Sequence, residues 1–121
     1  MVGNAVWFEI PSSDFERAVK FYESVFQVEL RREKIGGDLA VFPGEESSVT
    51  GAIVSQAGYV PAANGAVVYL SAGNDLNPML VRVVAAGGKL VEPKTALPPG
   101  MGHYAHFMDS EGNRIGLHSE N

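Results

Sequence analysis

The chain has 121 residues, of which 45% are hydrophobic and 19% are charged. These values are typical of one globular domain, residues 1–121, with enough length to bury an apolar core. The formal net charge of −5 and the scattered basic residues argue against nucleic acid as a partner, because phosphate binding needs clustered lysine and arginine. The lack of cysteine excludes disulfides and thiolate chemistry.

No apolar run reaches the roughly 18 residues of a membrane span, and the N-terminus lacks the basic and apolar regions of a signal peptide. We therefore expect a cytoplasmic protein that has no membrane partner.

The first half is predicted to form a strand, a helix and three more strands. Residues 6–10 are rich in β-forming side chains and end at Pro11, which indicates a strand. Ser13 lies three residues before Glu16, and this capping box predicts the start of a helix over 14–26. Apolar residues recur along this helix at the spacing of one buried stripe. The remaining strands are expected at 29–34, 39–42 and 50–55, with a solvated loop at 45–48.

The second half follows a connection at 58–65 and repeats the same order. A strand is expected at 66–71, and Asn77 followed by Pro78 predicts a helix N-cap with proline at the first helical position. The glycines at 87 and 88 end that helix. The last strands are expected at 89–92, 104–108 and 114–118, with a proline- and glycine-rich loop at 95–102 and a polar turn at 109–113.

Both halves thus have the order βαβββ, with similar spacing. Asp14 precedes Gly51 by 37 residues, and Asp75 precedes Gly116 by 41. Two such units can bury each other's apolar faces. We predict an α+β fold of two tandem βαβββ modules, at about 1–57 and about 65–121, with a ligand cavity where they meet.

Four segments of the chain resemble the vicinal oxygen chelate superfamily, which includes glyoxalases, bleomycin resistance proteins and extradiol dioxygenases. They occur in the family's order and are FEIP at 8–11, DFERA at 14–18 with FY at 21–22, AAGG at 85–88, and FMDSEGNRI at 107–115. The resemblance implies paired modules whose curled mixed sheets surround a cavity, and commonly a homodimer. Fold alone does not fix the reaction.

Chemically active members of this superfamily bind a divalent metal through histidine and glutamate side chains. The four ligand positions fall here on Trp7, on Gly51 or Ala52, on Val67 and on Gly116. None of these side chains binds a divalent ion, so we expect no metal or other cofactor unless unusual ligands are used. Glyoxalase-type chemistry, which needs a Lewis acid and a proton-moving carboxylate, is then unsupported.

Strand alternation gives a substitute set of pocket residues, because positions two apart share a face. The predicted set is an aromatic wall, a carboxylate, an imidazole and a glycine floor: Trp7, Glu9, Gly51, Val67, Tyr69, Ser71, His103, Gly116 and His118. Glu9 and His118 are the candidates for a catalytic role, as an acid–base pair. Glu9 could instead bind a ligand, or pair structurally with His118 or Arg114. His103 and His106 are predicted on opposite strand faces, with His103 near a cavity mouth and His106 at the surface or an interface.

Three functions remain open at this point. The chain could bind a small organic molecule without a metal, could be a divergent metal-dependent lyase or dioxygenase-like enzyme, or could be a structural or interaction module. We favour the first of these, because apolar walls with a few polar groups are typical of small-molecule sites.

Overall fold

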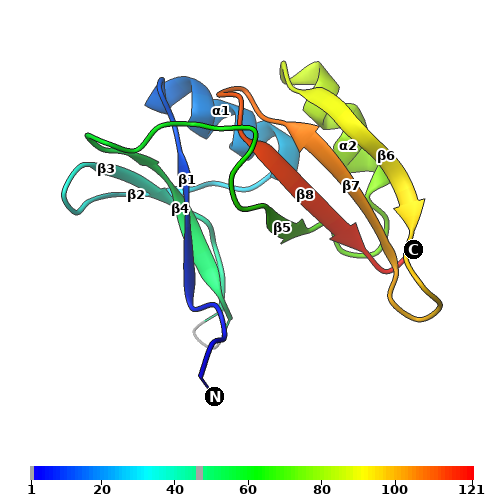
Figure 1. Ribbon diagram of the computed structural model, residues 1–121. Helices are drawn as coiled ribbons and strands as arrows, with labels where there is room; N and C mark the ends of the chain where they lie inside the picture. The colour runs from blue at the N-terminus through cyan, green and yellow to red at the C-terminus, as the bar shows by residue number, and fades with distance from the viewer. Residues whose placement is uncertain (1, 46–47) are drawn as a thin grey trace.

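The computed structural model describes residues 2–45 and 48–121; Met1 and residues 46 and 47, which belong to the loop predicted over 45–48, lie outside this range. The described chain forms eight strands and two helices in two similar modules. Both helices lie behind the strands in Figure 1, and the two sheets do not close on each other. The predicted α+β class and the tandem βαβββ order are confirmed.

The first module contains β1 (Trp7–Pro11), α1 (Phe15–Phe26), β2 (Arg31–Lys34), β3 (Asp38–Val41) and β4 (Thr50–Ser55). Its sheet has the order β1-β4-β3-β2, with β1 parallel to β4 and the other neighbours antiparallel.

The second module contains β5 (Val68–Ser71), α2 (Asn77–Ala85), β6 (Lys89–Ala96), β7 (His103–Met108) and β8 (Arg114–Ser119). Its sheet has the equivalent order β5-β8-β7-β6. Strand β6 continues beyond the predicted end at Glu92, because two register shifts allow it to pass Pro93 and still pair with β7. An edge strand tolerates this proline, which has no N–H to donate.

The predicted helix caps are corrected by the structure. Asp14, rather than Ser13, is the N-cap of α1, and its Oδ1 accepts a hydrogen bond from the Arg17 N–H at 3.2 Å. Asn77 lies inside α2, whose N-cap is Leu76 and has no side-chain hydrogen bond. The side chain of Asp75 accepts from the Asn77 N–H instead, at 3.0 Å.

One apolar core joins both sheets to both helices. Tyr22 of α1, Ile53 of β4 and Phe107 of β7 belong to a single cluster of buried side chains. The opposite face of the first sheet carries a smaller cluster around Val41 and Val54. The core therefore fixes which face of each strand points away from the helices and is available for function.

The turn between β7 and β8 docks onto the first module through Glu111. The Glu111 side chain is fully buried, and its Oε1 accepts from the backbone N–H groups of Ser13 and Asp14 at 3.0 and 2.8 Å. Arg17 Nε donates to Oε2 at 2.7 Å. Burial alone would raise the pKa of Glu111, but these hydrogen bonds outweigh it and lower the pKa to about 2.

Asp109 and Asn113 complete this docking. The Tyr22 hydroxyl donates to Asp109 Oδ2 at 2.6 Å, and the Asn113 amide donates to the Pro11 carbonyl at 2.8 Å. Burial and the Asp109 carboxylate raise the pKa of Tyr22 well above its ordinary value, so this phenol remains a donor. The polar turn thus connects the two modules as well as two strands.

We expect Glu111→Gln to lower the free energy of unfolding by about 2 kcal/mol at neutral pH, because hydrogen bonds to a buried charge are lost. The wild type should lose stability as the pH falls from about 4.5 toward 2, since over that range the unfolded chain takes up a proton that folded Glu111 does not. Urea unfolding across this range should show a shallower acid dependence in the variant. Glu29→Gln, at an exposed position, is the control. Equal acid dependence in Glu111→Gln and wild type would contradict this assignment.

Candidate functional site

The second sheet has an open face, which points away from the helices. The register pairs Tyr69 with Gly116, His106 with Gly116 and Tyr104 with His118, so side chains from β5, β8 and β7 share this face. A pocket of about 520 Å³ lies on it and is lined by Tyr69, Glu92, Leu97, Tyr104, His106, Arg114 and His118. Its walls combine aromatic rings with a few polar groups, as in many small-molecule sites.

A hydrogen-bonded chain of three side chains crosses the pocket wall. Arg114 Nε donates to His106 Nδ1 at 2.9 Å, and His106 Nε2 lies 2.6 Å from the Tyr69 hydroxyl. Arginine can only donate, so Nδ1 must be unprotonated and the neutral ring carries its hydrogen on Nε2. His106 therefore donates to the Tyr69 oxygen, which leaves the Tyr69 hydroxyl hydrogen free for another acceptor.

The surroundings of His106 favour its neutral form. Partial burial lowers its pKa, the positive charge of Arg114 lowers it further, and the Glu92 carboxylate acts in the opposite direction. The neutral ring is the state that the hydrogen bond from Arg114 requires.

Aromatic packing holds the Tyr69 ring in place. A Cβ atom at Gly116 would collide with that ring, so glycine allows the Tyr69 ring to lie directly against β8. The His106 ring meets the Tyr69 ring and the Tyr104 ring edge-on, with centroids 5.2 and 5.6 Å away. The predicted floor at Gly116 is thus covered by Tyr69.

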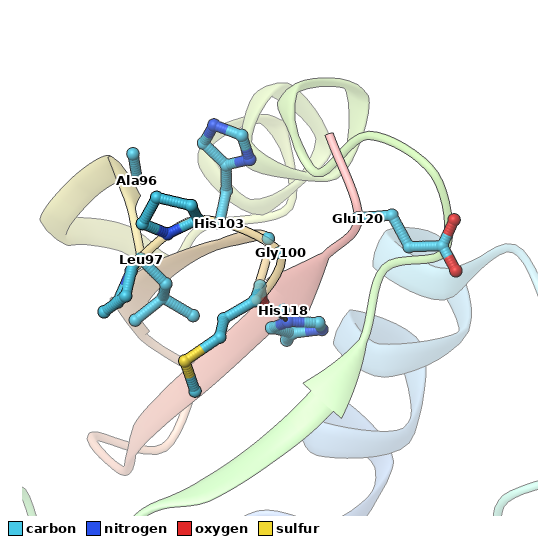
Figure 2. Close-up of a pocket in the computed structure, with 10 residues that line it drawn as sticks. Ala96, Leu97, Gly100, His103, His118 and Glu120 are labelled. Carbon is cyan, nitrogen blue, oxygen red and sulfur yellow. Dashed lines mark hydrogen bonds between the residues drawn. The ribbon is translucent and has the colours of Figure 1, made fainter.

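A second hollow, of about 570 Å³, adjoins the first and shares Leu97 and His118 with it. It is lined by the 97–102 loop together with Ala96, His103, His118 and Glu120 (Figure 2). His118 Nε2 lies 2.7 Å from the Met101 carbonyl oxygen and therefore donates to it. Figure 2 shows the His103 and His118 rings on opposite sides of the strands, in agreement with the pairing of His103 with buried Ser119.

The structure does not join the predicted residues of the first sheet to this pocket. Trp7 Nε1 donates to Glu9 Oε2 at 3.2 Å, and both side chains lie on the first sheet. Gly51 pairs with Phe8 and lies under its ring, on the face opposite to Glu9. The residue that shares the face of Glu9 is Ala52, one position along the strand.

The suggested pairing of Glu9 with His118 has no hydrogen bond to support it within residues 2–45 and 48–121, because each side chain has a different partner. Ser71 Oγ accepts from the Gly73 N–H at 3.2 Å and lines a separate apolar hollow between the modules, of about 330 Å³. Val67 lies just before β5. Of the predicted pocket residues, Tyr69, Gly116 and His118 come together on the second sheet's open face.

Sequence reasoning missed His106, Arg114, Tyr104 and Glu92 as pocket residues. Strand alternation puts Arg114 on the same face of β8 as Gly116 and His118. The register of β7 with β8 then places His106 opposite Gly116 and Tyr104 opposite His118. Glu92 could not be placed in this way, because it lies between two register shifts in β6.

The positions where the resemblance would place metal ligands do not fit a divalent ion. The assigned positions hold Trp7, Gly51 or Ala52, Val67 and Gly116, and an indole, alkyl side chains and glycine offer no side-chain ligand atom. Among the described residues, no group of three or more histidine, aspartate or glutamate side chains is arranged to hold a metal. Neither described helix could span a membrane.

We expect Arg114→Gln to raise the pKa of His106, because the substitution removes both the neighbouring positive charge and the N–H that requires an unprotonated Nδ1. An NMR titration of the His106 ring protons measures this directly. Arg31→Gln, which removes an arginine from an exposed ion pair in the first sheet, is the control and should leave the pKa unchanged. An unchanged or lower His106 pKa in Arg114→Gln would contradict the arrangement described above.

Comparisons with known proteins agree with this fold. Residues 4–117 match the Glyoxalase/Bleomycin resistance protein/Dioxygenase superfamily. A glyoxylase-like domain-containing protein of Didymella fabae is 30% identical over 124 residues, covering 92% of this chain and 89% of that protein.

Solved structures show the same fold at lower identity. A glyoxalase/bleomycin resistance protein from Albidiferax ferrireducens aligns with a TM-score of 0.75 at 16% identity, covering 96% of this chain and 98% of that one. The antibiotic binding protein TnmS3 from Streptomyces aligns with a TM-score of 0.64 at 20% identity, covering 99% and 98%.

Glyoxalase I from Zea mays aligns with a TM-score of 0.68 at 21% identity over 95% of this chain, and the chain spans only 45% of that protein's length. The resemblance seen in the sequence segments is confirmed, and this chain belongs to the Glyoxalase/Bleomycin resistance protein/Dioxygenase superfamily.

Proposed function

We propose that this chain binds a small organic molecule on the second sheet's open face, without the metal ligands typical of the catalytic members of its superfamily. The observation that carries the proposal is the pocket in which Tyr69 and Tyr104 stand beside the polar groups of His106 and Arg114. Apolar walls supply affinity, and a few directional donors fix the orientation of a ligand.

The comparisons support binding without specifying a reaction. TnmS3 is described as an antibiotic binding protein and matches this chain over nearly the full length of both. The maize glyoxalase I is about twice as long as this chain, so its activity does not transfer with the fold. The positions at which catalytic members carry metal ligands hold side chains without donor atoms in this chain. This favours small-molecule binding over metal-dependent lyase or dioxygenase chemistry.

The proposal includes a homodimer in which a second copy covers part of the open faces. Trp7 is 42% exposed and Tyr69 is 52% exposed, each on a face of its sheet that no helix covers. Large aromatic side chains in such positions are common at interfaces. Sedimentation equilibrium that gives the mass of one chain at all micromolar concentrations would contradict this part.

A thermal-shift screen of small organic molecules tests the binding function. Compounds that bind should raise the melting temperature by several degrees at about 100 times their Kd, because binding to the native state stabilises it. The shift should persist in a chelator, and Tyr104→Ala should reduce it. Tyr59→Ala removes an exposed tyrosine outside the pocket and is the control.

Two results would overturn this function. One is a screen without a reproducible shift. The other is a shift that a chelator abolishes and a divalent metal restores, together with near-stoichiometric metal by elemental analysis.

A further inference from the structure

The pocket contains a guanidinium group without a carboxylate partner. Arg114 donates through Nε to His106 and, among the described residues, forms no ion pair. The Nη groups of Arg114 thus keep N–H donors that no described carboxylate accepts. By contrast, Arg17, Arg31 and Arg32 each have a glutamate partner within 3.0 Å. In a chain with a net charge of −5, an unpaired arginine that lines a pocket is a local site for an anion.

A second donor on the same wall is the Tyr69 hydroxyl. The order of donation from Arg114 through His106 uses the lone pair of Nδ1 and one lone pair of the Tyr69 oxygen, and leaves the phenolic hydrogen unused. His106 is therefore a positioning residue. It directs the Tyr69 O–H toward an acceptor other than His106 and Arg114.

The other residues that line the pocket indicate the rest of the ligand, beyond the group that accepts these hydrogen bonds. The rings of Tyr69 and Tyr104 and the Leu97 side chain suit a flat apolar body. Glu92, from β6, lines the same pocket and would repel a second negative group. The site is thus suited to a single negative charge on an otherwise apolar molecule.

We infer that the ligand of this site is a monoanionic aromatic or conjugated carboxylate, whose oxygens accept from Arg114 and from the Tyr69 hydroxyl while its ring lies against Tyr104. This inference rests on the proposed function and adds the chemical class of the ligand. A planar carboxylate matches the planar guanidinium, which can donate two parallel hydrogen bonds to it.

Three probes with the same ring separate charge from shape: naphthoate, its neutral amide naphthamide, and the cationic naphthylmethylamine. Their dissociation constants are measured by NMR titration of the full chain at pH 7.5, where His106 is neutral. Naphthoate should bind at least about tenfold more tightly than naphthamide, and the cation should bind most weakly.

Variants test whether the preference for naphthoate over naphthamide comes from pocket residues. Arg114→Gln should weaken naphthoate by about 10- to 100-fold and remove its advantage over naphthamide. Tyr69→Phe should weaken both probes by about 3- to 10-fold, because it removes the hydrogen donor and retains the ring. Arg31→Gln removes the same charge far from the pocket and should leave the preference intact. Circular dichroism spectra confirm that each variant is folded.

The outcomes distinguish this inference from the proposed function. Binding of naphthamide as tight as that of naphthoate, or an equal preference in wild type and Arg114→Gln, overturns the anionic ligand class and leaves small-molecule binding intact. Failure of all three probes to shift any resonance of β5, β7 or β8 also overturns this ligand class, and small-molecule binding is then decided by the thermal-shift screen.

Discussion

The arrangement of this molecule depends on the docking of the Asp109–Asn113 turn onto the first module. Glu111 satisfies backbone N–H groups at the start of α1 and pairs with Arg17, so a carboxylate of the second module completes the helix end of the first. Removing a donor from a buried carboxylate is destabilising, so these hydrogen bonds favour one relative position of the modules. The turn also immediately precedes Arg114, and its docking holds the start of β8 and hence one end of the hydrogen-bonded chain in the pocket.

Opposite faces of the second sheet have different roles. One face carries Phe107 and Leu117 into the shared core, and the alternate positions on the same strands carry His106, Arg114 and His118 to the pocket. The superfamily fold is therefore retained, and the open face of its second sheet carries aromatic and polar side chains around a pocket. The same sheet geometry can support either chemistry, since the fold fixes where side chains meet and the residues decide what they do.

Much of the fold follows from local signals. Apolar periodicity predicted α1, glycine and proline marked the turns, and the repeated order of elements predicted two modules. The face of Gly51 could not be predicted reliably, because a shift of one residue reverses the faces of a strand. The sequence predicts His106 at the surface or an interface, because a single histidine gives no spacing signal. Its hydrogen bonds depend on Arg114 and Tyr69, which lie 8 and 37 residues away in the sequence. The position of Glu92 in the pocket depends on the irregular pairing of β6 with β7, which the sequence does not reveal.

Arg114 fixes the tautomer of His106, which in turn leaves the Tyr69 hydroxyl hydrogen without an acceptor among the described residues. Long-range proton–nitrogen NMR correlation of the histidine rings reads this tautomer directly. At pH 7.5 we expect His106 to carry its proton on Nε2 and Nδ1 to have the nitrogen shift of an unprotonated acceptor. A proton on Nδ1 would disprove this arrangement, because Arg114 could not then donate to that atom and the Tyr69 hydrogen would be used within the protein.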